Sequence, residues 1–209
     1  VYKRQIMTAA AKARLTAIIV AAGGGTRMGG EVEKQFRLFA GKPVLAHSVE
    51  AFLQHPATER VVVVAAETRM DTAKAAIGDL AGDERVLITA GGDRRQDSVR
   101  AGLALAADDA ALVAIHDAAR PLLPQGIITG LVAAMEESGA HNIMAALPVL
   151  PVTDTLKSVK DDRVTGTTPR AGLGRAQTPQ IFRRAYLQAL YESHCLLYTS
   201  DAADDSRSV

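Results

Sequence analysis

The stretch AIIVAAGGGTRMGGEVEKQF, residues 17–36, decides the fold that the rest of the chain must build. Its apolar run, residues 17–22, stops at three glycines, and Arg27 and Lys34 follow. Continuous apolar runs are typical of strands buried on both faces of a parallel sheet. A glycine-rich loop directly after such a strand predicts a phosphate site, because small residues let backbone N–H groups close around an anion.

Two common phosphate-binding loops are excluded by residues within this stretch. The dinucleotide fingerprint G-x-G-x-x-G, started at Gly23, requires a glycine where Met28 stands. The Walker loop G-x-x-x-x-G-K-[ST], started at Gly25, requires lysine and a hydroxyl residue where Glu31 and Val32 stand. The pattern AAGGGTRMG followed by EKQF resembles instead the nucleotidyltransferase signature G-x-G-x-R-M…P-K-Q. In that signature an arginine and a lysine neutralise the phosphates of a nucleoside triphosphate.

The chemistry of nucleotidyl transfer accounts for the two cations. Attack on an α-phosphorus gathers negative charge on non-bridging oxygens and on the departing pyrophosphate. Fixed cations at that place stabilise the transition state more than the ground state. Arg27 can hold phosphate oxygens with two parallel hydrogen bonds, and Lys34 can follow the moving charge. The competing interpretation is a glycine-rich turn with two solvated cations.

Composition limits the partners and the compartment. The 209 residues are 48% hydrophobic and 22% charged, with a net charge of +1, which argues for neither nucleic acid nor an anionic membrane as partner. No apolar stretch approaches the roughly 20 residues of a membrane span, and no signal core opens the chain. The single cysteine, Cys195, excludes an intramolecular disulfide. We therefore expect a cytoplasmic protein.

Alternating apolar runs and Ala/Leu-rich helical patterns predict the architecture. Strands are expected at 16–22, 60–65, 85–89, 111–116 and 142–147, and helices at 43–54, 69–80, 94–107, 125–138 and 183–191. This alternation predicts a three-layer α/β/α sandwich around a mostly parallel, Rossmann-like sheet. Two short β-rich runs around a turn at 160–163 predict a protruding β-arm over about 151–170. We expect one domain over 7–194, with 1–6 and 195–209 as non-native tails.

Polar segments follow two further strands, where open α/β sheets bind ligands. GGDRRQDSVRAG contains Asp93 and Ser98, and HDAARP contains Asp117 and Arg120. As alternatives, Asp93 and Ser98 would cap a helix, and Asp117 and Arg120 would form an ion pair in a turn. His116 is expected to be structural.

Three more candidates fall in the arm and its return. Thr155, Arg170 and Thr178 are polar residues in β-rich segments. Their alternative interpretation is strand-forming threonines and a solvated arginine.

The full set of motifs resembles the 2-C-methyl-D-erythritol 4-phosphate cytidylyltransferase family. The matching segments are AAGGGTRMG, EKQF, KPVLAHSVEAF, GGDRRQDSV, HDAARP, PVTDTLK and TPRAGLGRAQTPQIF, in this order over about 16–194. The family forms CDP-methylerythritol from CTP and methylerythritol phosphate, with release of pyrophosphate, in non-mevalonate isoprenoid synthesis. The resemblance implies Mg²⁺ as cofactor and a homodimer in which the arm reaches the neighbouring subunit.

The resemblance also implies a role for each candidate residue. The resemblance implies that CTP is contacted by Ala21, Ala22, Gly23, Gly92, Asp93 and Ser98. Catalytic roles fall to Arg27, Lys34 and Arg170. Substrate binding falls to Asp117, Arg120, Thr155, Arg170 and Thr178, with Arg170 on the substrate's phosphate and Asp117 beside the Mg²⁺-bound triphosphate. The nucleophile is the substrate's own ionised phosphate, so no general base is required.

Three departures from the family pattern are visible. Glu33 stands where proline is usual, and Gly174 stands where tryptophan is common. The family's final Asn-x-Lys-x-Thr segment is absent, so we expect this chain to be a poor enzyme. Two other functions remain open: ribitol-5-phosphate cytidylyltransferase, and a nucleotide-binding module without turnover.

Overall fold

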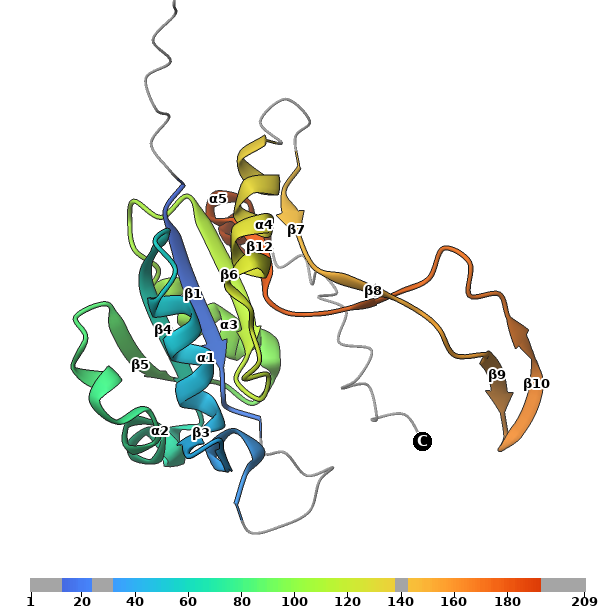
Figure 1. Ribbon diagram of the computed structural model, residues 1–209, viewed down its shortest axis with the longest axis horizontal. Coiled ribbons are helices and arrows are strands. Elements are labelled where there is room, and N and C mark those ends of the chain that lie inside the picture. The colour runs from blue at the N-terminus through green and yellow to red at the C-terminus, as the bar shows by residue number, and fades with distance from the viewer. Residues whose placement is uncertain (1–12, 24–31, 138–142, 193–209) are drawn as a thin grey trace, which may run out of the picture.

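The computed structural model describes residues 13–23, 32–137 and 143–192. Its centre is a six-stranded sheet with the strand order β5-β4-β1-β6-β12-β7 (Figure 1). The strands are β1 (Leu15–Val20), β4 (Thr58–Ala65), β5 (Val86–Ala90), β6 (Leu112–Asp117), β7 (Ala145–Ala146) and β12 (Gln180–Arg183). Two further short strands, β2 (Leu38–Phe39) and β3 (Lys42–Pro43), form a hairpin before the first helix.

The apolar run that opened the sequence forms the central strand of this sheet. β1 pairs in parallel with both neighbours, so that Ile18 is in register with Val62 on β4 and with Ile115 on β6. All three of these side chains are fully buried. Burial on both faces explains why these strands are continuously apolar rather than alternating.

Helices cover both faces of the sheet and complete three layers, as predicted. α1 (Val44–Leu53), α2 (Met70–Ile77) and α4 (Gln125–Glu137) share one hydrophobic cluster with the sheet. α3 (Arg95–Ala104) and α5 (Arg184–Glu192) share a second cluster on the other face. The predicted fold class is therefore confirmed, and each cluster follows from an apolar helix face that must be covered.

One strand of the sheet was missed, and another was predicted too long. β12 runs antiparallel between β6 and β7, with Ile181 and Phe182 buried in the core. The sequence prediction treated these residues only as the approach to the last helix, because four residues are too few to show a period. Of the predicted strand 142–147, only β7 pairs with another strand, and residue 142 lies outside the described residues.

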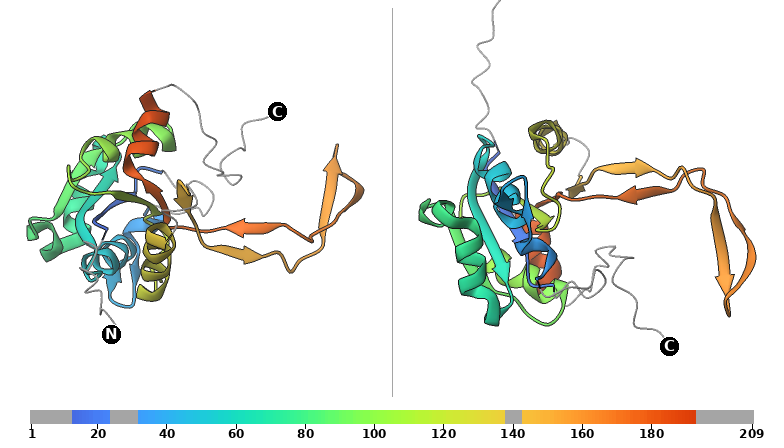
Figure 2. Two further views of the ribbon diagram at one scale, coloured as in Figure 1. Left: turned by 90° about the horizontal axis from the view of Figure 1, so that it is seen from above. Right: turned by 60° about the horizontal axis from the view of Figure 1, so that its bottom comes forward.

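The predicted arm is present and is longer than expected. It consists of two successive ribbons, β8 (Val149–Pro151) with β11 (Gly174–Ala176), and β9 (Leu156–Lys160) with β10 (Arg163–Thr168). Asp161 and Asp162 have φ values of 50° and 58°, as in the tight turns that suit a twisted hairpin. Figure 2 shows both ribbons extending away from the three-layer core.

In the part of the chain that the structure describes, no helix has the length and hydropathy needed to cross a bilayer.

Candidate active site at the carboxyl ends of the strands

Loops from three strands are tied together at the carboxyl edge of the sheet. The N–H of Ala21, after β1, donates to Val64 O at 2.7 Å, and the N–H of Gly91, after β5, donates to Ala65 O at 2.7 Å. The N–H of Ala118, after β6, donates to Val20 O at 3.0 Å. Each loop is thereby held against a neighbouring strand, and the predicted CTP-binding and substrate-binding segments share one edge.

Gly91 lies where the loop after β5 packs closely against the loop after β1. A Cβ atom on this residue would lie 2.5 Å from Ser98 Oγ and 3.1 Å from Ala22 Cβ. Ser98 itself is buried, and its hydroxyl donates to Gly92 O at 3.4 Å. The structure therefore brings the predicted residues Ala22, Gly92 and Ser98 together, with no room for a side chain at Gly91.

Capping of α3 falls to a residue that the sequence analysis did not single out. Asp97 Oδ2 accepts from the Arg94 N–H at 3.3 Å and from Arg94 Nε at 2.9 Å. The Arg94 side-chain hydrogen bond is the main reason that the pKa of Asp97 is lowered. Asp93 does not cap α3, because it is an exposed residue before the N-cap residue Arg94, and Ser98 lies in the polar first turn of this helix with its hydroxyl on Gly92 O.

Asp117 lies between two guanidinium groups. Its Oδ1 accepts from Arg95 Nη2 and its Oδ2 from Arg120 Nε, each at 3.1 Å. The pair with Arg120 is the turn ion pair that the sequence analysis allowed. The sequence analysis did not predict the role of Arg95. Its contact with Asp117 joins residues 22 positions apart in the chain, and no local pattern indicates such a pairing. Its side chain is only 16% exposed, which holds the pair in place.

A chain of hydrogen bonds fixes the backbone on either side of Asp117. The Thr178 hydroxyl accepts from the Asp117 N–H at 3.4 Å and donates to His116 Nδ1 at 3.1 Å. His116 Nε2–H then donates to Arg120 O at 3.1 Å. Burial lowers the pKa of His116 to about 4, so the ring is neutral and can accept at one nitrogen while donating at the other. The expected structural role of His116 fits this geometry, and its ring also packs edge-on against Phe52.

Gln177 is a second residue without a sequence signal. Its Oε1 accepts from Arg120 Nη1 at 2.5 Å, and its Nε2 donates to Ala176 O at 2.9 Å. The Arg120 guanidinium is therefore shared between Asp117 and the segment that returns from the arm.

Lys34 is held near the start of the first loop by its neighbours. It begins the short 3-10 helix η2 (Lys34–Phe36), in which Gln35 is buried. Gln35 Nε2 lies 2.9 Å from Ala21 O and 3.2 Å from Gly23 O. The other predicted cation, Arg27, lies outside the described residues.

Two predicted substrate-binding residues are not brought to this edge. Thr155 and Arg170 flank the outer ribbon of the arm, which Figure 2 shows well away from the sheet. There the Arg170 guanidinium donates to Thr153 O. Within one chain, the arm residues and the strand-end residues form two separate groups.

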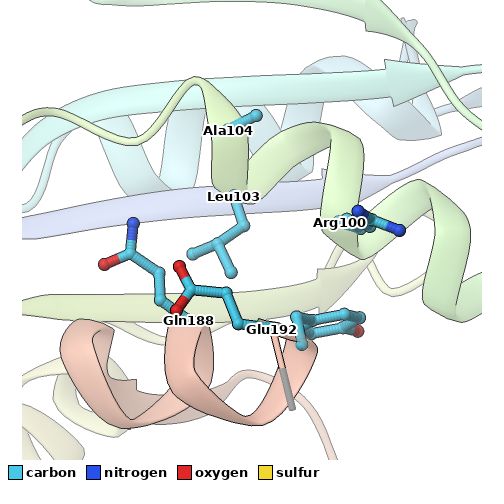
Figure 3. Close-up of a pocket in the computed structure, with 6 residues that line it drawn as sticks. Arg100, Leu103, Ala104, Gln188 and Glu192 are labelled. Atoms are coloured by element: carbon cyan, nitrogen blue, oxygen red, sulfur yellow. The ribbon is translucent and has the colours of Figure 1, made fainter. Parts of the chain in front are cut away.

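A groove of about 220 Å³ lies elsewhere, between α3 and α5 (Figure 3). It is lined by Arg100, Leu103, Ala104, Gln188, Tyr191 and Glu192. None of the predicted site residues lines it, and it lies between two helices rather than at strand ends. The strand-end site remains the candidate, because open α/β sheets bind ligands at that edge.

Comparisons with known proteins agree with this geometry. A family model described as IspD, 2-C-methyl-D-erythritol 4-phosphate cytidylyltransferase, matches residues 15–209. The 2-C-methyl-D-erythritol 4-phosphate cytidylyltransferase of Frankia casuarinae is 40% identical over 193 residues, which cover 92% of this chain and 69% of that protein. The bifunctional enzyme IspD/IspF of Rhizorhabdus wittichii is 46% identical over 183 residues, and the chain spans 45% of that relative's length.

A solved structure shares the fold. The crystal structure of 2-C-methyl-D-erythritol 4-phosphate cytidylyltransferase from Thermus thermophilus has a TM-score of 0.65 and 29% sequence identity. The match covers 86% of this chain and 75% of the Thermus chain. With the strand-end loops, the protruding arm and the family match in agreement, this chain belongs to the 2-C-methyl-D-erythritol 4-phosphate cytidylyltransferase family.

Proposed function

We propose that the chain transfers CMP from CTP to 2-C-methyl-D-erythritol 4-phosphate and releases pyrophosphate. The observation that carries the proposal is the convergence of the loops after β1, β5 and β6 at one sheet edge, with Lys34 and the Asp117–Arg120 pair beside them. Its site of action is the cytoplasm, where CTP is available.

The glycine-rich loop and the start of α3 form the nucleotide half of the site. Ala21, Ala22 and Gly23 add no bulk, and because the Ala21 N–H already donates to Val64 O, the backbone N–H groups of Ala22 and Gly23 are the ones that would meet a triphosphate. We expect the space beside Gly92, Asp93 and Ser98 to admit a pyrimidine and to exclude a purine on size. CTP is therefore the expected nucleotide.

Chemistry proceeds by direct displacement at the α-phosphorus. An oxygen of the substrate's phosphate forms the new P–O bond, and the bond to the bridging oxygen breaks as pyrophosphate leaves with its electron pair. Arg27 and Lys34 offset the charge that grows on the phosphoryl oxygens. The attacking phosphate is already ionised at neutral pH, so the site needs orientation rather than a general base.

Mg²⁺ fits this site as an ion carried by the triphosphate. Among the described residues, no group of three or more His, Cys, Asp or Glu side chains could hold a metal by itself. Mg²⁺ commonly binds through one or two carboxylates together with substrate phosphates. Asp117 is the carboxylate at this edge, and it would exchange a guanidinium partner for the ion. When bound, Mg²⁺ would neutralise phosphate charge.

A homodimer would complete the substrate half of the site. Thr155 and Arg170 flank the outer ribbon of the arm, and Figure 2 shows this ribbon away from the sheet of its own chain. The arm also exposes apolar side chains, namely Val149, Leu150, Val159 and Val164. Exposed apolar residues on a protruding element are typical of an interface. We therefore infer that the arm of one subunit serves the site of the other.

An assay of pyrophosphate release distinguishes the proposed reaction from the two alternative functions, ribitol-5-phosphate cytidylyltransferase and a nucleotide-binding module without turnover. With Mg²⁺ and CTP, release is expected with methylerythritol phosphate and little with ribitol 5-phosphate, and ATP or GTP should be poor donors. Preference for ribitol 5-phosphate would assign the chain to the other cytidylyltransferase reaction. CTP binding by calorimetry, without release for either alcohol phosphate, would identify a nucleotide-binding module.

Mixing two impaired variants tests the shared site, in assays at an alcohol phosphate concentration low enough that each variant alone turns over little. In a dimer of Lys34→Ala with Arg170→Ala, one site loses both residues and the other keeps both. Refolding the two variants together should restore about a quarter of the wild-type turnover, since half of the dimers are mixed. Activity that stays at the level of the separate variants would show that each arm serves its own chain.

A further inference from the structure

Glu33, directly before Lys34, replaces the proline of the family pattern. This change has two expected costs. It removes the rigidity of proline, and it adds a negative charge beside a lysine that must meet a triphosphate. Contacts made by the Glu33 side chain offset both.

The rigidity is supplied by hydrogen bonds on either side of Lys34. Glu33 Oε2 accepts from Gln35 Nε2 at 3.0 Å, and the same nitrogen lies near the carbonyl oxygens of Ala21 and Gly23. The backbone of Glu33 has φ −60° and ψ 141°, a conformation that proline also adopts. Gln35 is thus bound to the segment that follows β1, and Glu33 is bound to Gln35 while its backbone keeps a conformation that proline could adopt.

The charge is offset by an arginine from a different segment. Arg69 closes the 3-10 helix η3 (Glu67–Arg69), which follows β4. Its Nε donates to Glu33 Oε1 at 3.1 Å, and the Glu33 side chain is only 21% exposed. A partly buried carboxylate with a guanidinium partner repels a nearby phosphate less than an unpaired one does.

We propose that Glu33 and Arg69 are positioning residues for Lys34. Glu33 holds the backbone of η2 in place through its hydrogen bond with Gln35. Arg69 fixes the Glu33 carboxylate by an ion pair and offsets its negative charge. Their contribution to turnover rests on the proposed function, whereas their anchoring of η2 does not.

A double-mutant comparison tests the contribution to turnover. Arg69→Met should lower kcat/KM for CTP about three- to fivefold, the upper range for a surface ion pair. Arg69→Lys should recover most of that loss. In a Glu33→Pro background, which needs neither contact, Arg69→Met should change kcat/KM by less than about 1.5-fold. Equal losses in both backgrounds would overturn the proposal, because Arg69 would then act through something other than Glu33.

Hydrogen exchange tests the anchoring without any turnover. The Phe36 N–H donates to Glu33 O at 2.9 Å and the Arg37 N–H to Lys34 O at 3.4 Å, so their exchange rates report on η2. Arg69→Met should speed exchange in the peptide that covers 33–37, and should not do so in the Glu33→Pro background. Unchanged exchange in both backgrounds would overturn the anchoring even if the enzyme proves active. A wild-type chain that binds no CTP would overturn the proposed function and leave this measurement valid.

A matched ion pair nearby serves as the control. Lys42 Nζ contacts Glu50 Oε2 at 2.8 Å, and these side chains are exposed to a similar degree, 54% and 32%. Lys42→Met should leave both kcat/KM for CTP and the exchange of the 33–37 peptide within about 1.5-fold of wild type. Effects as large as those of Arg69→Met would mean that any lost surface ion pair disturbs this region, which contradicts the proposal.

Discussion

The strand-end site and the arm are built by different means. At the sheet edge, Ser98 and His116 are buried, and every loop is tied to a neighbouring strand. Along the outer ribbon of the arm, nearly all residues are exposed, and order comes from the strand ladder and cross-strand bonds such as Lys157 Nζ to Thr167 Oγ1 at 2.7 Å. Core packing therefore fixes the segments that we propose to bind the nucleotide, whereas the residues of the outer ribbon are exposed and held only by the ribbon itself.

This contrast predicts different sensitivities. Substitutions of the buried residues at the sheet edge should disturb turnover and stability together, because the proposed site rests on their packing, whereas loss of a partly exposed cation should lower turnover alone. Substitutions on the arm should change substrate binding or association and leave the stability of the core alone.

Lys34→Ala should have the largest effect on the sheet-edge side. Loss of one fixed cation at the phosphoryl group should lower turnover on the order of 10²-fold or more, with circular dichroism unchanged. The same loss is expected from Arg27→Ala. Lys157→Ala, an exposed lysine on the arm, should stay within about twofold of wild type. Turnover near the wild-type level in Lys34→Ala would remove the residue from the catalytic set.

The second prediction concerns pH and His116. Its pKa is lowered to about 4 by burial, so the unfolded chain takes up the proton first as the pH falls. The free energy of unfolding should therefore be full above about pH 6.5 and fall by about 2–3 kcal/mol between pH 6.5 and pH 4.5. Urea midpoints at several pH values measure this.

Two variants separate His116 from the other titrating groups. His116→Gln, although less stable at neutral pH, should lose most of this pH dependence. His47→Gln, at a less buried histidine on α1, should keep it. An equally steep pH dependence in His116→Gln would assign the effect to other groups.

Arg170→Ala should separate the arm from the nucleotide half. The KM for the alcohol phosphate is expected to rise about 10- to 100-fold, as for a lost charged hydrogen bond, while CTP affinity by calorimetry stays nearly unchanged. Arg163→Ala, at the turn of the same arm, should alter neither quantity. A large loss of CTP affinity in Arg170→Ala would move this residue to the nucleotide side.

The smallest expected effect compares one glycine of the packed core with one glycine of the arm. A Cβ on Gly102 of α3 would lie 2.5 Å from Ile18 Cγ2, whereas a Cβ on Gly166 of β10 would meet nothing within 4 Å. Gly102→Ala should lower the free energy of unfolding by about 1–2 kcal/mol, since overpacking outweighs the gain in helix propensity. Gly166→Ala should stay within about 0.5 kcal/mol. Equal urea midpoints for the two variants would contradict the contrast between the packed core and the exposed arm.

The sequence prediction was accurate where a local pattern carries the information. The apolar run 17–22 predicted the central strand, and its glycines predicted a loop at the strand's end. The turn at 160–163 predicted the outer hairpin, because two short β-rich runs flank it. The prediction was incomplete for β12, Asp97, Arg95 and Gln177, whose roles depend on partners that a local pattern does not reveal.

By itself the sequence determined the layers and the position of the strand-end loops, because burial periodicity and glycine placement act within a few residues, whereas the roles of the site residues are what the family resemblance implies. Only the tertiary structure decided which groups meet. Asp117 contacts Thr178 across 61 residues, and Glu33 contacts Arg69 across 36. It also decided that the outer ribbon, which Thr155 and Arg170 flank, extends away from the sheet of its own chain. Such pairings follow from the strand order of the sheet and the course of the arm, which bring distant segments together or keep them apart.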